Sequence, residues 1–281
     1  MTLAPGPAME PFFLPVDGGQ RFCLFHPAAG ACRGAVLYVH PFAEELNRSR
    51  RMAALQARAL AAQGYGVLQI DLHGCGDSSG DFGDARWETW RRDLAAAYAW
   101  LDTRLDRPIT LLGLRLGAAL ALDFARTEAK APAGIVLWQP ALSGPSVLAQ
   151  FLRLRVANDM LSGGDTRTGT AALRAALARG ETLEIAGYDL HPELALAIES
   201  LDPALLTPHK IPVHWFELAT APDRPLTAAA SSTVERWRRA RAQVQAWQVV
   251  GQPFWSTQEI TECPALVAAT CDAIREPVHA V

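Results

Sequence analysis

Short apolar runs alternate with longer amphipathic stretches along most of this chain. Two runs at 11–15 and 21–26 flank the turn Asp17-Gly18-Gly19, which predicts an antiparallel hairpin. The later apolar runs lack polar alternation, which is typical of parallel strands covered by helices on both faces. We expect these strands at 35–40, 66–71, 109–112, 134–139, 211–218 and 244–250, and helices at 49–63, 87–105, 116–128, 233–241 and 264–274.

The segment 143–208 interrupts this alternation. Strand patterns fade there, and helical stretches appear at 171–179 and 192–200. We interpret the segment as a helical cap inserted after the sixth strand, so that 1–142 and 209–281 together form the core. Two edge strands and six core strands predict the α/β-hydrolase fold, with an eight-stranded, mostly parallel sheet and helices on both faces.

The turn after the strand at 109–112 holds the most informative residue. The stretch Gly113-Leu114-Arg115-Leu116-Gly117 has the strand–turn–helix setting of the nucleophile elbow G-x-S-x-G, but arginine takes the place of serine. A guanidinium stays protonated and cannot attack a carbonyl. Arg115 also lies at the positive end of the dipole of the helix predicted at 116–128, where a cation is disfavoured by roughly 0.3–1 kcal/mol. We therefore expect an acidic partner (Glu44, Glu45 or Asp223) or an anionic ligand, and we favour the ion pair.

The loops after the last two strands are where a serine triad would keep its acid and its histidine. Asp223 lies in the acid region, although a turn aspartate is an equally good interpretation. The stretch Gly251-Gln252-Pro253-Phe254-Trp255 follows the last strand and contains no histidine. His279 comes after the final helix, and we expect His209 and His214 to be structural. Loss of both serine and histidine removes the usual mechanism of serine acyl transfer.

Other strand ends supply further candidates. His40 and Glu44 follow one strand and His73 follows the next, so each is an acid–base candidate beside a structural interpretation. A literal G-x-S-x-G at 76–80 is interpreted as a decoy, because no helix begins there. Four aromatic residues at strand ends predict an apolar or stacking pocket for a ligand, unless they pack under the cap: Phe42, Trp138, Phe254 and Trp255.

Composition narrows the functional classes. Half of the 281 residues are hydrophobic and the formal net charge is -3, which gives no electrostatic case for nucleic acid or an anionic membrane. The five cysteines are scattered without a C-x-x-C pair, so we expect reduced thiols, no metal site and no cofactor. We see no secretory signal and no apolar stretch of transmembrane length, and we expect a cytoplasmic protein.

Three motifs together resemble the type 2 exosortase A system-associated hydrolases. They lie at 40–50, at 113–117 and at 252–255, and the resemblance runs over nearly the full chain. It implies a bacterial α/β-hydrolase-superfamily protein from loci that encode exopolysaccharide production and exosortase sorting. It also implies that Arg115 is a family feature and that exopolysaccharide or exosortase-system proteins are partners.

Three functional hypotheses follow. In the first, the serine triad is degenerate, and the protein is an accessory or binding protein, or an unconventional hydrolase, for a small anionic, acyl or sugar ligand. In the second, it is an active esterase- or peptidase-like hydrolase in which Arg115 binds an anionic substrate and Glu44, Asp71 or His73 gives acid–base help. A third hypothesis is a scaffold whose cap contacts partner proteins.

Overall fold

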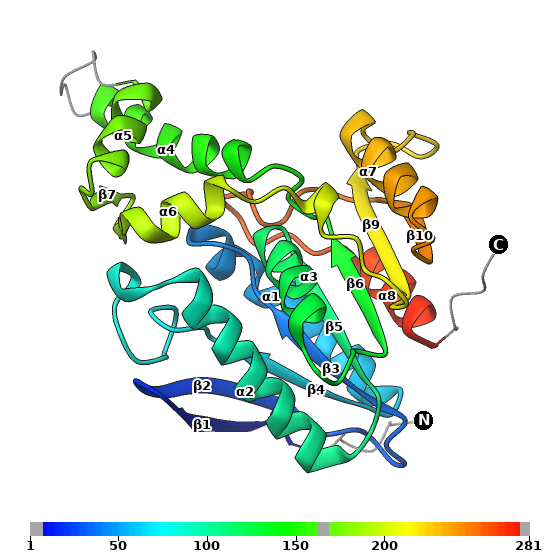
Figure 1. Cartoon of the computed structure of the whole chain (residues 1–281). Helices are drawn as coiled ribbons and strands as arrows, with labels where there is room; N and C mark the ends of the chain where they lie inside the picture. The colour runs from blue at the N-terminus through cyan, green and yellow to red at the C-terminus, as the bar shows by residue number, and fades with distance from the viewer. Residues whose placement is uncertain (1–7, 162–168, 276–281) are drawn as a thin grey trace.

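An eight-stranded sheet forms the centre of the molecule (Figure 1). The computed structural model describes residues 8–161 and 169–275. The strand order is β1-β2-β4-β3-β5-β6-β9-β10, in which β2 runs antiparallel to both of its neighbours and the other pairs are parallel. The strands are β1 (Glu10–Val16), β2 (Gly19–His26), β3 (Gly34–Val39), β4 (Tyr65–Ile70), β5 (Ile109–Leu114), β6 (Gly134–Trp138), β9 (Val213–Ala219) and β10 (Val244–Val250). The expected α/β-hydrolase fold is confirmed.

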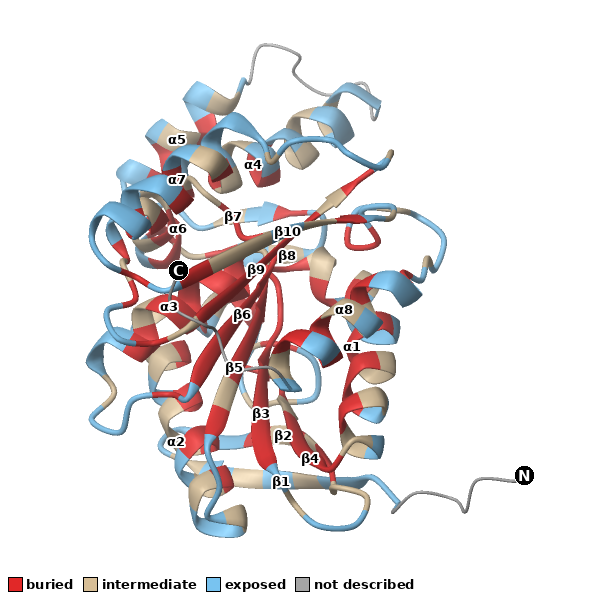
Figure 2. Cartoon of the chain, turned by 90° about the vertical axis from the view of Figure 1, so that its right-hand side faces the viewer, coloured by how far each residue is buried: buried red, intermediate tan, exposed pale blue. Residues whose placement is uncertain are grey.

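Helices cover both faces of this sheet, and its central strands are buried (Figure 2). One face packs against α1 (Glu44–Ala62) and α8 (Pro264–Arg275), and the other against α2 (Trp87–Leu105), α3 (Leu116–Thr127) and α7 (Ala228–Arg239). The apolar runs of the sequence predict this, because a strand buried on two faces has no solvent side for polar residues. Within the described residues, no helix combines the length and the apolarity needed to cross a membrane.

Between β6 and β9 the chain forms a layer over the carboxyl edge of the sheet (Figure 1). In the described residues, the layer contains three helices, α4 (Gly144–Leu161), α5 (Thr170–Ala178) and α6 (Pro192–Glu199). A short antiparallel hairpin, β7 (Leu183–Ile185) and β8 (Tyr188–Leu190), precedes α6, and the 3-10 helix η2 (Pro203–Leu205) follows it. The sequence predicts only helices in this segment, whereas the structure also contains a short hairpin there. Three-residue strands are too short to show an alternating pattern, so the hairpin gave no signal.

The helix α1 begins at Glu44, five residues before the predicted start at residue 49. Ala43 precedes it with φ 48° and ψ -125°, a conformation that non-glycine residues rarely adopt. Ser49, the predicted first residue, lies buried inside the helix. The early start turns the first acidic residues of α1 toward the sheet edge, where the candidate site lies.

Candidate functional site

Arg115 occupies a strained turn between β5 and α3. Its backbone has φ 56° and ψ -118°, which costs about 1–3 kcal/mol for a residue with a side chain. The Arg115 N–H donates to the Trp138 carbonyl oxygen over 3.0 Å, and the Arg115 carbonyl oxygen accepts from the N–H groups of Ala118 and Ala141. The turn after β6 therefore holds the elbow in place, and the strain does not depend on a serine.

Two glycines bring the elbow into direct contact with its surroundings. A Cβ atom on Gly113 would lie 2.5 Å from Ala118 Cα, and one on Gly117 would lie 2.3 Å from the His40 carbonyl oxygen. These are distances that real Cβ atoms do not adopt, so no larger residue fits without backbone movement. The close packing of strand and helix that the small residues predict is present.

The Arg115 side chain has an acidic partner. Its Nε lies 3.2 Å from Glu45 Oε1, and only 17% of the Arg115 side chain and 14% of the Glu45 side chain are exposed. One Nη group donates to Gln150 Oε1 of α4 over 3.4 Å. The guanidinium carbon also lies 5.5 Å from the ring centroid of Trp255, a cation–π distance. Of the three acidic residues weighed from the sequence, Glu45 forms the ion pair.

Arg115 affects the protonation of the Glu45 carboxyl. Burial raises the pKa of the Glu45 carboxyl above its usual 4.5, while the charge of Arg115 and its hydrogen bond pull that pKa down. Glu44, at the start of the same helix, also has a raised pKa because it is partly buried. The carboxyl that contacts Arg115 is therefore held ionised mainly by that arginine.

The replacement Arg115→Ala is expected to destabilise the protein in a pH-dependent way. Without Arg115 the pKa of Glu45 in the folded protein rises further. Because the folded protein then binds this proton more tightly than the unfolded chain does, the protein loses stability as the pH rises above 4.5. The difference in unfolding free energy between wild type and variant should grow between about pH 5 and pH 8, to about 1–2 kcal/mol. Urea unfolding at several pH values measures it. In a Glu45→Gln background the difference should be flat, and a flat difference with Glu45 present would contradict the pairing.

Trp255 stands in the loop where a triad histidine is expected. Phe254 packs edge-on against Trp255 at 5.1 Å and against Trp138 at 6.1 Å. The indole N–H of Trp138 donates to Thr270 Oγ1 of α8 over 2.8 Å. Trp138 and Phe254 thus pack in the core under α8, while Trp255 contacts the guanidinium. The aromatic residues proposed from the sequence do not gather around a single pocket.

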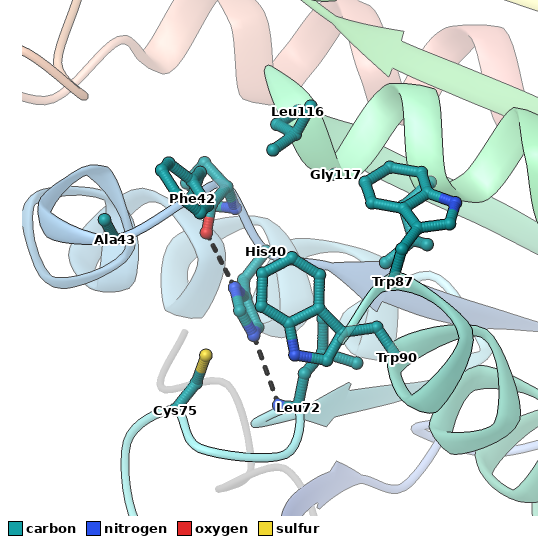
Figure 3. Close-up of a pocket in the computed structure, with 11 residues that line it drawn as sticks. His40, Phe42, Ala43, Leu72, Cys75, Trp87, Trp90, Leu116 and Gly117 are labelled. Atoms are coloured by element: carbon teal, nitrogen blue, oxygen red, sulfur yellow. Dashed lines mark hydrogen bonds between the residues drawn. The ribbon is translucent and has the colours of Figure 1, made fainter. Parts of the chain in front are cut away.

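Two small pockets border the elbow. A polar pocket of about 30 Å³ lies between Arg115 and α4, and Glu44, Glu45 and Gln150 line it. An apolar pocket of about 10 Å³ lies next to it and is drawn in Figure 3. Phe42 and Leu116 line both pockets. The polar pocket has room for one small group, such as a water or a carboxylate.

His40 bridges two loops beneath the elbow. Its Nδ1 lies 2.7 Å from the Pro41 carbonyl oxygen, and its Nε2 accepts from the Leu72 N–H over 3.2 Å (Figure 3). A nitrogen that accepts from an N–H is unprotonated, so Nδ1 carries the proton and the ring is neutral. Burial lowers the pKa of His40, in agreement with a neutral ring. Since both nitrogens are occupied, this geometry favours a positioning role.

The remaining candidates lie outside the elbow pocket. The backbone N–H of His73 donates to Asp93 Oδ2 over 2.7 Å, and the imidazole ring of His73 packs over Gly80. Burial lowers the pKa of His73. Asp223 is exposed in the loop after β9. Ser78, the centre of the literal G-x-S-x-G, donates from Oγ to the Asp71 carbonyl oxygen and accepts from the Phe22 N–H. These bonds hold a loop against β2, as expected for a decoy.

The hydrogen bonds and side-chain groups of the described residues bear on a serine–histidine pair and on a metal site. In residues 8–161 and 169–275, no serine hydroxyl is hydrogen-bonded to a histidine ring. Over the same residues, no three His, Cys, Asp or Glu side chains are grouped so as to hold a metal ion. His279 lies outside the described residues.

Comparison with known proteins points to one fold. Residues 30–168, a little under half of the chain, match the family model described as Serine aminopeptidase, S33. The structure is similar to that of Est1E from Butyrivibrio proteoclasticus with bound ferulic acid, with a TM-score of 0.70 and 14% identity over 94% of this chain and 98% of that one. For a thermostable carboxyl esterase from Bacillus coagulans the TM-score is 0.66, with 14% identity over 96% of this chain and 98% of that one. For proline iminopeptidase from Mycobacterium smegmatis the TM-score is 0.58, with 14% identity over 95% of this chain and 98% of that one. No curated protein matches the chain in sequence.

Proposed function

We propose that this chain, which has the α/β-hydrolase fold, binds a ligand at its elbow instead of attacking one. The observation that carries the proposal is the ion-paired Arg115 at the turn between β5 and α3, with Trp255 across from it. In this proposal the serine triad is degenerate and the protein has an accessory or binding role.

Chemistry supports a binding role. Serine acyl transfer needs an oxygen nucleophile and a base that removes its proton. A guanidinium is always protonated, and the indole of Trp255 has only a donor N–H. What remains at the elbow is a set of donors: the Arg115 guanidinium and the N–H groups of Leu116 and Gly117, which begin α3 and have no partner within the helix. Such a set suits the carboxylate or other anionic group of a small acyl or sugar ligand.

The biological setting is proposed from the motifs. The resemblance at 40–50, 113–117 and 252–255 to type 2 exosortase A system-associated hydrolases favours a role in exopolysaccharide or surface-protein processing. We infer a cytoplasmic location and partners among the proteins of that system. The cap at 143–208 supplies Gln150 to the elbow pocket, so this segment is expected to take part in ligand selection.

A panel of short acyl esters tests the proposal. The purified protein should hydrolyse none of them faster than the heat-inactivated protein does. Turnover that a single substitution abolishes, at any one residue of the elbow pocket, would overturn the binding role.

Glu44 is the observation that favours the alternative, an active hydrolase. It lines the pocket beside Arg115, and its raised pKa is a property of groups that act as general acids. In that alternative Arg115 binds an anionic substrate, and both Glu44→Gln and Arg115→Ala should abolish turnover of the correct substrate while the fold survives. Unchanged turnover in Arg115→Ala would reject it.

A further inference from the structure

The two edges of the sheet differ in how they are protected. Its outer strands are β1 and β10. A proline in a paired strand has no N–H to donate, so Pro11 and Pro15 of β1 face away from β2, as does Phe13 between them. Glu10 adds a charge to the same strand. Prolines and charges keep an edge strand from pairing with another chain, so the β1 edge is closed to such pairing.

The β10 edge lacks this protection. The strand reads VQAWQVV, with neither a proline nor a charged side chain. Trp247 and Val250 are 36% and 49% exposed. In Figure 2 the strand faces the viewer, with α7 on one side of it and α8 on the other. An uncharged, largely apolar strand at an open edge is a template for pairing with a further strand.

The bonds to β9 show which residues of β10 face outward. The Gln243 carbonyl oxygen accepts from the Val213 N–H, and the Gly251 N–H donates to the Ala219 carbonyl oxygen. Backbone groups point to alternate sides along a strand. The odd-numbered residues of β10 therefore bond to β9, and the even-numbered residues turn their N–H and carbonyl groups to the open edge.

Side chains already occupy the two ends of this edge. The Val244 carbonyl oxygen accepts from the Arg238 guanidinium over 3.0 Å, and the Val250 carbonyl oxygen accepts from Cys263 Sγ over 3.6 Å. Among the described residues, nothing occupies the outward backbone groups in the middle of the strand, which belong to Ala246 and Gln248.

These free groups are complementary to those of a second copy of the same strand. Across a two-fold axis at Trp247, an antiparallel pair sets Ala246 of each copy opposite Gln248 of the other. Each such pair exchanges two N–H···O bonds, so the two pairs use every free group of both strands. Trp247 then lies opposite the partner's Trp247 in a position without hydrogen bonds, where side chains come closest.

Aromatic packing supports this register. The Trp247 ring stacks on His214 at 5.3 Å and on Phe216 at 5.0 Å, with interplanar angles of 12° and 15°. The row of rings on this face of the sheet ends at Trp247, which remains partly exposed. A second Trp247 across the axis continues the row, and aromatic pairs across strands stabilise a sheet.

Charge also favours an antiparallel second copy. Exposed arginines gather near the start of β10, in the last turn of α7 and in the turn after it: Arg236, Arg238, Arg239 and Arg241. The loops that follow β9 and β10 carry the exposed acids Asp223 and Glu259, together with Arg224. A two-fold axis brings the start of one β10 beside the end of the other. The more basic end of each copy then faces the more acidic end of its partner.

We propose that β10 is the interface of a symmetric homodimer, in which two sheets join into one of sixteen strands, eight from each copy. The elbow follows β5, and both β6 and β9 lie between β5 and β10 in the sheet. The dimer therefore leaves the elbow open, and this inference does not depend on the function proposed for Arg115.

Sedimentation velocity of the full chain tests the proposal. The protein should be a dimer at about 100 µM and should dissociate on dilution. Ala246→Pro removes an outward N–H from each copy without removing a bond to β9, and a proline is tolerated at that position of an edge strand. It should raise the Kd of the dimer by about tenfold or more. Trp247→Lys should also raise it, because two like charges then lie opposite each other.

Phe13→Pro is the matched control. It makes the same kind of change at an outward residue of the other edge strand, and it should leave the Kd of the dimer unchanged. Far-UV circular dichroism checks that each variant is folded. Hydrogen exchange gives a readout that needs no substitution. Segment 244–250 should exchange more slowly at about 100 µM than at about 1 µM, and segment 10–16 should exchange equally at both concentrations.

Three results would overturn the proposal. One is a protein that stays monomeric at about 100 µM. Another is a dimer that neither Ala246→Pro nor Trp247→Lys weakens, which would place the interface elsewhere. The third is a dimer that Phe13→Pro weakens as much as Ala246→Pro does. If Ala246→Pro fails to fold, Trp247→Lys and the exchange of segment 244–250 decide.

Discussion

Replacing Gly117 by alanine is expected to destabilise the protein by about 3 kcal/mol, at the upper end of the cost of overpacking. The new Cβ would lie 2.3 Å from the His40 carbonyl oxygen and 2.5 Å from the Val39 carbonyl oxygen. Both are backbone atoms of the strand and loop beside the elbow, so they cannot rotate away as a side chain would. The contact between α3 and the His40 loop must therefore open.

Urea unfolding of Gly117→Ala measures this loss. Gly83→Ala is the control, because a Cβ on Gly83 meets nothing closer than Asp189 Cβ at 3.4 Å. The control should change the unfolding free energy by less than about 0.5 kcal/mol. Equal stabilities of the two variants would mean that the elbow is packed more loosely than described.

Replacing Asp93 by alanine is expected to cost about 3–5 kcal/mol, because it leaves a buried cation without its partner. Arg21 Nε lies 2.7 Å from Asp93 Oδ1, and the two side chains are 1% and 2% exposed. The variant also removes the acceptor of the His73 N–H. Both effects loosen the loop that follows β4.

An exposed ion pair provides the comparison for Asp93→Ala. Glu10 and Arg104 lie 2.9 Å apart with side chains 46% and 48% exposed, and Glu10→Ala should cost less than about 1 kcal/mol. Chemical unfolding of the two variants at pH 7 gives both values. A loss below about 1 kcal/mol for Asp93→Ala would show that Arg21 finds water or another acceptor.

Much of the fold can be predicted from the sequence, because strands that are buried on both faces of the sheet appear as continuous runs of apolar residues. The helix Trp87–Leu105 and the strand Val244–Val250 have the predicted bounds. The start of α1 could not be placed, because it depends on the positive φ of Ala43, a backbone conformation set by packing. The helix α4 gave no signal, since its apolar residues include the exposed Met160 and Leu161 as well as buried ones.

The turn at Arg115 was predictable from the sequence, but the contacts of its side chain were not. Arg115 stands out because the elbow has a sequence signature. The choice of Glu45 over Glu44 and Asp223 depends on where α1 begins, which only the packed structure fixes. Gln150 had no signal at all, because it reaches the elbow from a helix far along the chain. Contacts between distant segments carry no local pattern.

Strain at position 115 has a physical reason in the surviving architecture. Gly113 and Gly117 bring strand and helix so close that the residue between them is forced to a positive φ, whichever side chain it carries. The turn therefore forms with arginine at position 115 and does not need a serine there. Glu45 then offsets the charge that arginine brings to the positive end of α3.

Intact-protein mass spectrometry after treatment with a fluorophosphonate tests the central claim most directly. An elbow that presents a paired guanidinium has no activated oxygen, so the mass of this protein should stay unchanged while an active serine hydrolase in the same reaction gains one adduct. A stoichiometric adduct on a serine of this chain, lost when that serine or a neighbouring histidine is replaced, would contradict the account.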